Sequence, residues 1–198
     1  MSAANHEARR RRIADIVLRV IIEEGLEAAT VRRIAAEVGY STAVVTHYFA
    51  DKRDLLLSAF RALGEANRIK FDACYACDPP DLLGYLMAMT ALDGIDGSAW
   101  RACIAFWDRA LRDPLFAAEL RGWIGEVLDR IELFIAALSP ACPASRRAAT
   151  QLFDLVQGLS THLLFDPECW NAGDVREALS GEIALLLGCA PGGDATTV

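Results

Sequence analysis

Apolar residues recur at helical spacing along nearly the whole chain, and this pattern limits the fold more than any other feature of the sequence. The first example consists of Ile13, Ile16, Val17, Val20 and Ile21, which fall on one face of a helix. No segment alternates apolar and polar residues between hairpin turns, as the strands of an antiparallel sheet do. The sequence therefore predicts an all-α protein without a sheet.

Glycine and proline divide this pattern into about nine segments of helical length. Gly25 ends the first helix, Gly39 ends the second, and a short third helix runs to about Tyr48. A fourth helix covers 51–73, before Asp78-Pro79-Pro80 marks the first strong boundary. The Gly/Thr-rich tail at 191–198 is expected to be disordered. The later helices are expected at about 80–92, 98–112, 115–138, 143–165 and 174–188.

Polar residues stand where three of the early helices should begin. Thr30 precedes the second helix, Ser41 or Thr42 the third, and Asp51 the fourth. Each of these side chains can accept a hydrogen bond from the first turn of the helix that follows, so each predicts an N-cap.

The charge of the chain is divided unevenly along its length. The net charge of −7 and the pI of about 5.0 argue, for the whole chain, against a nucleic-acid-binding protein. Residues 1–70, however, hold 12 Lys and Arg against 9 Asp and Glu, a net of +3. Residues 71–198 hold 8 against 18, a net of −10, and the two parts sum to −7. This asymmetry indicates a nucleic-acid-facing N-terminal part, with chance clustering of charge as the alternative.

Several protein classes are excluded by what the sequence lacks. Its apolar runs are far shorter than the roughly 18 residues that a membrane span needs, and no signal-peptide pattern follows Arg9–Arg12, so we expect a cytoplasmic protein. Cys74 and Cys77 form a single C-x-x-C without a second pair, so we expect no metal and no cofactor. The chain has no Gly-rich phosphate loop, nucleophile elbow or His-Glu-x-x-His motif, so we do not expect an enzyme.

The segment Thr30–Lys52 carries the most functional information. Its two short helices are joined by a turn at Gly39, as in a helix-turn-helix motif. The turn is close, and small side chains, including Val44, suit it. A compact helical hairpin in an all-α enzyme is the alternative. The second helix presents groups that can contact base edges in the major groove, and the residues around it can contact phosphates. The first set is Thr42, Ala43, Thr46 and His47, and the second is Tyr40, Tyr48 and Lys52.

The same segment resembles the DNA-binding domain of the TetR family of bacterial repressors. The resemblance rests on Gly39, Ser41, Tyr48-Phe49 and Lys52-Arg53-Asp54-Leu55-Leu56, in that order. The run 41–49 is similar to the choline/betaine-operon repressor branch, as is the Trp-rich segment 99–107. The resemblance implies that the DNA contacts are Arg32, Arg33, Tyr40, Ser41, Thr42, Ala43, Thr46, His47, Tyr48 and Lys52, with Arg32 and Arg33 as alternatives to one another.

The resemblance also implies a homodimer that binds a palindromic operator as double-stranded DNA and is released by a small-molecule effector. The DNA-binding domain would be 1–50, linked by helix 51–73 to an effector-binding and dimerisation domain at 74–190. A helical enzyme or an effector-insensitive, protein-binding adaptor is the alternative function.

Two further sets of residues belong to this implied second domain. The dimer would form through helices 143–165 and 174–188, unless their apolar stripes pack within one subunit. These stripes are Leu152, Leu155, Val156, Leu159 and Leu163, and Ile183, Leu186 and Leu187. Aromatic side chains could line an effector pocket for a cation, unless they belong to the core. These residues are Trp100, Phe106, Trp107, Trp123, Phe134, Phe153, His162 and Trp170.

Overall fold

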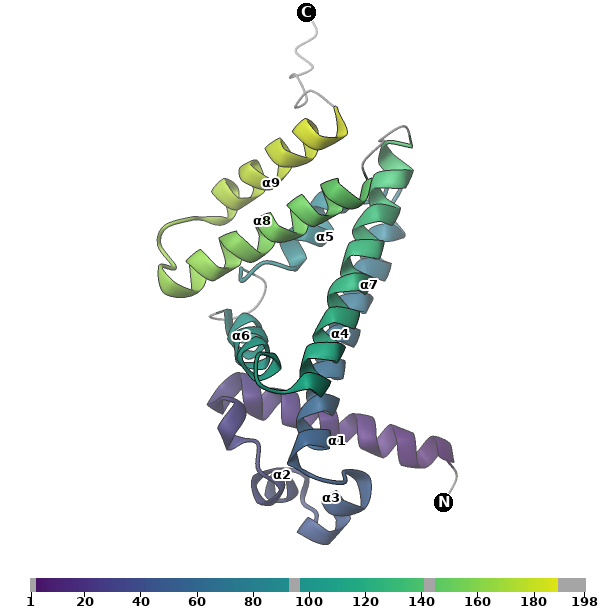
Figure 1. The fold of residues 1–198 in the computed structure, drawn as a ribbon, viewed down its shortest axis with the longest axis vertical. Coiled ribbons are helices and arrows are strands. Elements are labelled where there is room, and N and C mark those ends of the chain that lie inside the picture. Colours follow the sequence, from purple (N-terminus) through teal and green to yellow (C-terminus); the bar gives the residue numbers. More distant parts are fainter. Residues whose placement is uncertain (1–2, 93–96, 141–144, 189–198) are drawn as a thin grey trace, which may run out of the picture. The chain divides into compact units, whose positions relative to one another are not determined.

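The computed structural model describes residues 3–92, 97–140 and 145–188 (Figure 1). These residues form nine α-helices and one 3-10 helix, with no strand among them, so the expectation of an all-α fold is confirmed. The tail at 191–198 lies outside the described residues. The helices are α1 (Ala3–Glu24), η1 (Leu26–Ala28), α2 (Val31–Val38), α3 (Thr42–Tyr48), α4 (Lys52–Tyr75), α5 (Leu82–Ala88), α6 (Ser98–Ala110), α7 (Pro114–Leu138), α8 (Ser145–Phe165) and α9 (Ala172–Leu187).

The polar residues before three early helices act as N-caps, as the sequence predicts. The Thr30 hydroxyl accepts a hydrogen bond from the Arg33 amide (3.2 Å). The Asp51 carboxylate accepts one from the Asp54 amide (2.8 Å). Ser41, rather than Thr42, caps α3, because its hydroxyl accepts from the Val44 amide (3.4 Å). These bonds satisfy amides that have no partner inside their own helices.

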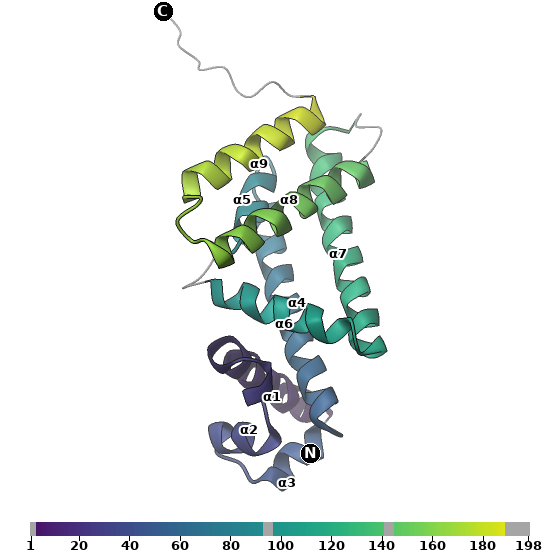
Figure 2. The same ribbon diagram turned by 60° about the vertical axis from the view of Figure 1, so that its left-hand side comes forward.

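The chain divides into two compact units. The first consists of Met1–Arg68 and Arg101–Leu120, and the second of Ile69–Trp100 and Arg121–Val198. In the first unit, α2 packs against both α1 and α3, and Figures 1 and 2 show these three helices together. Side chains from each of these helices and from α4 are fully buried in its core. They include Val17, Ile34, Val45 and Leu55.

Most of α6 belongs to the first unit, although the sequence places this segment in a second domain that begins at residue 74. The Phe106 ring lies against Phe60 of α4 (centroids 5.1 Å apart) and stacks with Phe116 of α7 (6.2 Å). Phe106 is therefore a core residue of the unit that contains α1–α3.

In the second unit, α5, α8 and α9 pack against one another. Two hydrogen bonds fix the segment after α5. The Trp100 indole donates to the carbonyl of Met89 (2.7 Å), and the buried Ser160 hydroxyl accepts from the amide of Ala91 (3.1 Å). An Asn171–Asp174 capping box begins α9. Across the described part of the chain, every helix is too short or too polar to cross a membrane.

Candidate nucleic-acid interface

The turn between α2 and α3 depends on the backbone conformation of Gly39. Its φ of 70° lies in the left-handed region that glycine adopts most easily. The Gly39 amide donates to the carbonyl of Ala36 (3.3 Å), and the Tyr40 amide donates to that of Ala35 (2.9 Å). This pair of bonds is a Schellman motif, which satisfies the carbonyls at the end of α2 and turns the chain towards α3.

Helix α3 is anchored on one side and open on the other. Val45 is fully buried and Tyr48 is only 4% exposed, so they hold the helix against the first unit. The predicted base-reading residues all lie exposed on the remaining surface. They are Thr42, Ala43, Thr46 and His47.

Val44 differs from the expectation that it fills the turn. It is 37% exposed, so it lies with the open side of α3 and adds an apolar group there. The sequence could not assign Val44 because it neighbours both the buried Val45 and the exposed Ala43. Which of the two valines is buried depends on how α3 is rotated about its axis, and the sequence alone does not show this.

Tyr48 also differs from the expectation that it lies at the surface beside a phosphate. Its ring packs against His6 (centroids 4.7 Å apart) and against His47 (5.3 Å). Its backbone carbonyl accepts a hydrogen bond from the Arg10 guanidinium. Since His6 and Arg10 belong to α1, Tyr48 joins α3 to α1 and positions His47.

The two arginines of α2 have different surroundings. Arg33 forms ion pairs with Glu24 (2.6 Å) and Glu37, whose hydrogen bonds raise the pKa of the guanidinium and lower that of Glu37. Arg32 is exposed and forms no ion pair among the described residues. Of the two alternatives, Arg32 is therefore the cation that is available to an external anion.

Lys52, at the start of α4, forms an ion pair with a carboxylate. Its ammonium lies 3.0 Å from the Glu27 carboxylate, and this hydrogen bond lowers the pKa of Glu27. The Glu27 side chain is 88% exposed and that of Lys52 is 43% exposed. An exposed pair of this kind is weak, so Lys52 can exchange Glu27 for another anion.

The residues expected in an effector pocket are spread over several elements. Trp123 of α7 and Phe153 of α8 meet edge to face (centroids 6.2 Å apart). Trp100 lies at the start of α6 and is buried, and Trp170 follows α8. His162 is exposed near the end of α8. Phe106 and Trp107 belong to the first unit.

Sequence reasoning named Phe134 as a candidate pocket residue but missed the aromatic cluster that it forms in the second unit. The ring of Phe134 contacts Phe71, Tyr75 and Tyr85 with centroid distances of 5.2–5.5 Å. Phe71 and Tyr75 stack on each other at the end of α4. Their spacing of four residues was the available signal, since it places both rings on one face of a helix.

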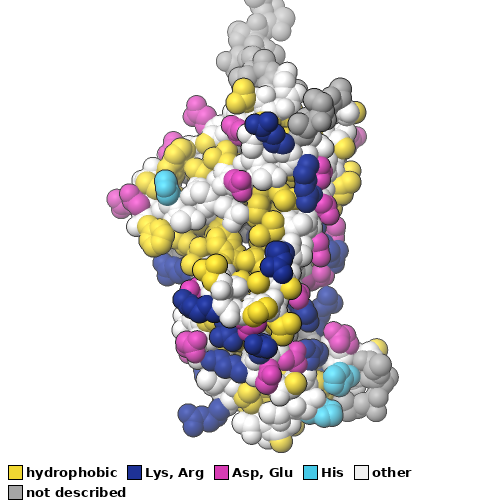
Figure 3. Space-filling view, in the orientation of Figure 1, with side chains coloured by type: hydrophobic (Ala, Val, Ile, Leu, Met, Phe, Trp, Pro, Cys, Tyr) yellow, Lys and Arg dark blue, Asp and Glu magenta, His cyan; other side chains and the backbone are white. Residues whose placement is uncertain are grey.

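The apolar stripe expected at a dimer interface faces the interior of one subunit. Leu152, Val156, Leu159 and Leu163 are at most 6% exposed, because α8 packs against α5 and α9. Of this stripe, Leu155 is only partly covered. These four residues therefore belong to the subunit core, and the most exposed part of α8 lies on its other side. The α9 stripe expected at the interface is half-buried; it consists of Ile183, Leu186 and Leu187. Figure 3 shows hydrophobic side chains at the surface of the second unit, and Lys and Arg side chains interspersed with Asp and Glu over the first unit.

A short helix that follows a tight turn, with an open polar face and a buried apolar one, defines a helix-turn-helix DNA-binding protein. Residues 15–59 match the model of the bacterial regulatory proteins of the tetR family, and residues 81–188 match the BetI-type transcriptional repressor C-terminal model. The chain belongs to the TetR family. It is a helix-turn-helix transcriptional regulator with a BetI-type C-terminal domain rather than an enzyme.

Curated relatives agree with this assignment, and solved structures share the fold. The regulator PksA of Bacillus subtilis (strain 168) is 30% identical over 92% of this chain and 91% of its own length. A BetI of Paraburkholderia phytofirmans is 31% identical over 89% and 85%. A Rhodococcus regulator has a similar fold (TM-score 0.78, 24% identity, 93% and 98% covered). So does a Saccharomonospora viridis regulator solved with choline (TM-score 0.76, 20% identity, 89% and 96% covered).

Proposed function

We propose that the protein binds a palindromic operator as a homodimer and inserts one α3 helix into the major groove at each half-site. The open face of α3 carries this proposal, because its small and polar side chains lie on a helix that is anchored by Val45 and Tyr48. A two-fold dimer would read half-sites separated by about 34–36 Å, which is one turn of DNA, or by a multiple of that distance.

Each exposed side chain of α3 suits a different contact. The Thr42 hydroxyl and the His47 imidazole can form hydrogen bonds with base edges. The Thr46 hydroxyl lies 3.1 Å from the carbonyls of Thr42 and Ala43, within hydrogen-bonding distance of its own helix. Thr46 would then contribute mainly its methyl group, which, like Ala43, can meet a thymine methyl.

Phosphate contacts would come from residues on either side of α3. Tyr40 is 38% exposed directly before the Ser41 cap, and Lys52 follows α3 at the start of α4. Arg32 supplies an available cation on α2. Such contacts fix the register of the protein on DNA rather than reading its sequence.

The dimer would form through the exposed sides of α8 and α9. Leu185 of α9 is 74% exposed, and Leu155 of α8 is partly exposed. Gly158 and Gly181 lie exposed on the same two helices, and a Cβ added at either would meet no atom within 4 Å. Residues without side chains allow another helix to approach closely, so these sides of α8 and α9 suit packing against a second copy.

A small molecule would bind in the second unit and favour a dimer whose α3 helices no longer match the operator. The BetI-type match over 81–188, the choline in the Saccharomonospora structure and the aromatic side chains of this unit support a cationic effector. Helices α4, α6 and α7 each hold residues of both units, and α4 is the one that follows the reading helix α3 directly, so we expect such a change to be transmitted through α4.

A gel-shift experiment with DNA from upstream of the protein's own gene tests this function. We expect specific binding that unlabelled DNA of scrambled sequence does not displace, and that is lost in the double variant Thr42→Ala plus His47→Ala. Weak binding that ignores both the sequence and the variant would contradict the proposal and favour a protein-binding adaptor. Choline, added to saturation, should weaken the specific complex; unchanged affinity would exclude choline as the effector.

A further inference from the structure

Four consecutive arginines, Arg9–Arg12, lie in the N-terminal half of α1 and divide between two sides of the helix. Successive residues of an α-helix are rotated by about 100°, so Arg9 and Arg12 return to nearly the same direction. Arg10 and Arg11 lie on another side of α1, which faces α4. The two pairs consequently have different surroundings.

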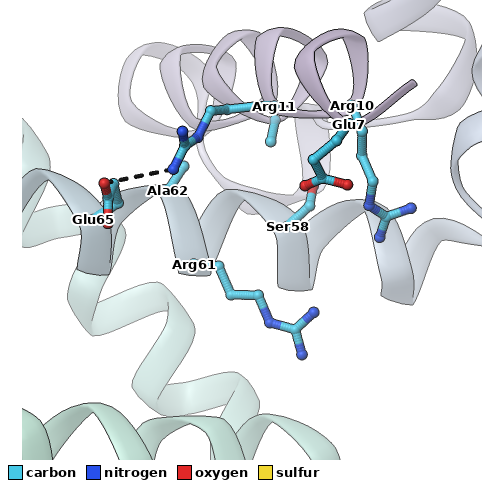
Figure 4. Close-up of a pocket in the computed structure, with 8 residues that line it drawn as sticks. Glu7, Arg10, Arg11, Ser58, Arg61, Ala62 and Glu65 are labelled. Carbon is cyan, nitrogen blue, oxygen red and sulfur yellow. Dashed lines mark ion pairs between the residues drawn. The ribbon is translucent and has the colours of Figure 1, made fainter. Parts of the chain in front are cut away.

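Arg10 and Arg11 are held by carboxylates of α4. Arg10 pairs with Asp54, and Arg11 pairs with Glu65 at 3.5 Å. Figure 4 shows the cleft between α1 and α4, of about 290 Å³, with the Arg11 guanidinium turned to Glu65. The carboxylate of Glu7 also lines this cleft, so its positive charge is largely balanced.

Arg9 and Arg12 line a second cleft, of about 350 Å³, on another side of α1. None of its described lining residues carries a carboxylate. Arg12 is exposed and forms no ion pair among the described residues. The guanidinium of Arg9 forms a hydrogen bond with the Tyr48 side chain, which raises the pKa of Arg9 and holds it in position. The lining residues are Asn5, Ala8, Arg9, Arg12, Ile13, Val38 and Tyr40.

We propose that this second cleft binds a phosphate of the DNA backbone beside the base pairs that α3 reads. The proposal rests on the proposed operator binding and adds a contact to it. The cleft offers the phosphate oxygens hydrogen-bond donors from the guanidinium groups of Arg9 and Arg12, the Tyr40 phenol and the Asn5 side-chain amide. Tyr40 ties the cleft to the reading helix, since the next residue, Ser41, caps α3.

The same argument assigns different roles to neighbouring arginines. Arg12 neutralises a phosphate and so releases counterions when DNA binds, whereas Arg11 stays with Glu65. Arg11 and Arg12 are adjacent, equal in charge and both exposed. Arg11→Ala is therefore a matched control for Arg12→Ala.

The test measures the affinity for the upstream DNA fragment by fluorescence anisotropy between about 50 and 200 mM salt. Losing one phosphate contact per subunit lowers the slope of log K against log salt by about 1.8 for a dimer. The loss of affinity over this fourfold salt range should thus be about twelvefold smaller for Arg12→Ala than for the native protein. Arg11→Ala should keep the native slope, and Arg12→Lys should restore most of it.

Equal slopes for the Arg11→Ala and Arg12→Ala variants would overturn the phosphate site. If Thr42→Ala plus His47→Ala still abolished specific binding, the proposed operator function would stand without it. Failure of the native protein to bind the fragment specifically would overturn both. Because Arg9 also contacts Tyr48, the Arg9→Ala variant is read only alongside a thermal unfolding curve that shows an intact fold.

Discussion

Arg10 of α1 and Asp54 of α4 form a two-point ion pair that joins the first helix of the DNA-binding unit to its fourth. The Arg10 guanidinium also lies 4.5 Å from the centroid of the Phe49 ring and donates to the carbonyl of Tyr48. Asp54 in turn accepts a hydrogen bond from the Ala50 amide (3.1 Å). The pair therefore fixes the end of α3, and through it the orientation of the reading helix.

Arg10→Ala should lower the free energy of unfolding by about 1–2 kcal/mol, because it leaves a partly buried carboxylate and a carbonyl without their charged donor. Urea denaturation measures this as a lower midpoint with an unchanged m-value. Arg11→Ala is the control and should cost less than about 0.5 kcal/mol, because its ion pair is largely exposed. An equal loss of unfolding free energy in both variants would contradict the structural role of Arg10.

Gly39→Ala should destabilise the protein by about 1 kcal/mol, because alanine is strained at a φ of 70°. No atom lies within 4 Å of the added Cβ, so the cost comes from the backbone alone. Gly122→Ala provides a control of opposite sign. Gly122 has equally open surroundings within α7, where alanine should stabilise the helix by about 0.5–1 kcal/mol. The measurement is the melting temperature of both variants. An unchanged melting temperature for Gly39→Ala would contradict the left-handed conformation assigned to Gly39.

The sequence was sufficient for the helices because their ends are marked locally. Thr30 and Ser41 cap helices within three residues, and Gly39 ends one by its own backbone conformation. The open face of α3 could be predicted for the same reason, since small polar residues follow the turn directly. The assignment of α6 to the first unit could not be predicted from the sequence, because the Phe60–Phe106 contact joins residues far apart in sequence.

Periodicity showed which residues share a face, but not what covers that face. The stripe of α8 that contains Leu152 and Val156 has the composition of an interface, yet α5 and α9 of the same subunit cover it. The burial of Tyr48 has a similar origin. It depends on α1 extending back to Ala3, which brings His6 against the ring, and no local signal near Tyr48 shows this.

Asp113→Asn should make stability less sensitive to acid. Burial raises the pKa of this carboxyl. The Leu115 amide and the guanidinium groups of Arg53 and Arg109 lower the pKa by more than burial raises it, so the folded-state pKa lies below the usual value. The stabilisation by this group is thus fully present above the unfolded-state pKa of about 3.9 and is lost as the pH falls through the lower, folded-state pKa.

The measurement is the melting temperature between pH 7 and pH 3. Asp113→Asn should lower it at pH 7, because two guanidinium groups lose their buried counter-charge. The difference from the native protein should then narrow as the pH falls. A constant difference over the whole range would show that Asp113 does not contribute to the acid sensitivity.

Leu185→Glu should convert the proposed dimer into a folded monomer. Leu185 is 74% exposed on α9, so a charge there leaves the subunit intact but disfavours burial against a second copy. Light scattering after size-exclusion chromatography gives the mass. Leu111→Glu is the matched control, since Leu111 is 86% exposed but lies just after α6, and this variant should remain a dimer. Dimers in both variants would exclude the α9 interface.

Glu27→Gln should tighten DNA binding, because Glu27 competes with phosphate for the Lys52 ammonium. Exposed ion pairs contribute about 0.2–1 kcal/mol each, so the gain in affinity should be at most about fivefold per subunit. Lys52→Ala should act in the opposite direction, weakening binding to every sequence and lowering the salt slope by about 0.9 per subunit. Adding Glu27→Gln to Lys52→Ala separates the two effects, since the gain should vanish when the ammonium is gone. A gain that persisted in the double variant would mean that Glu27 repels DNA directly, independently of Lys52.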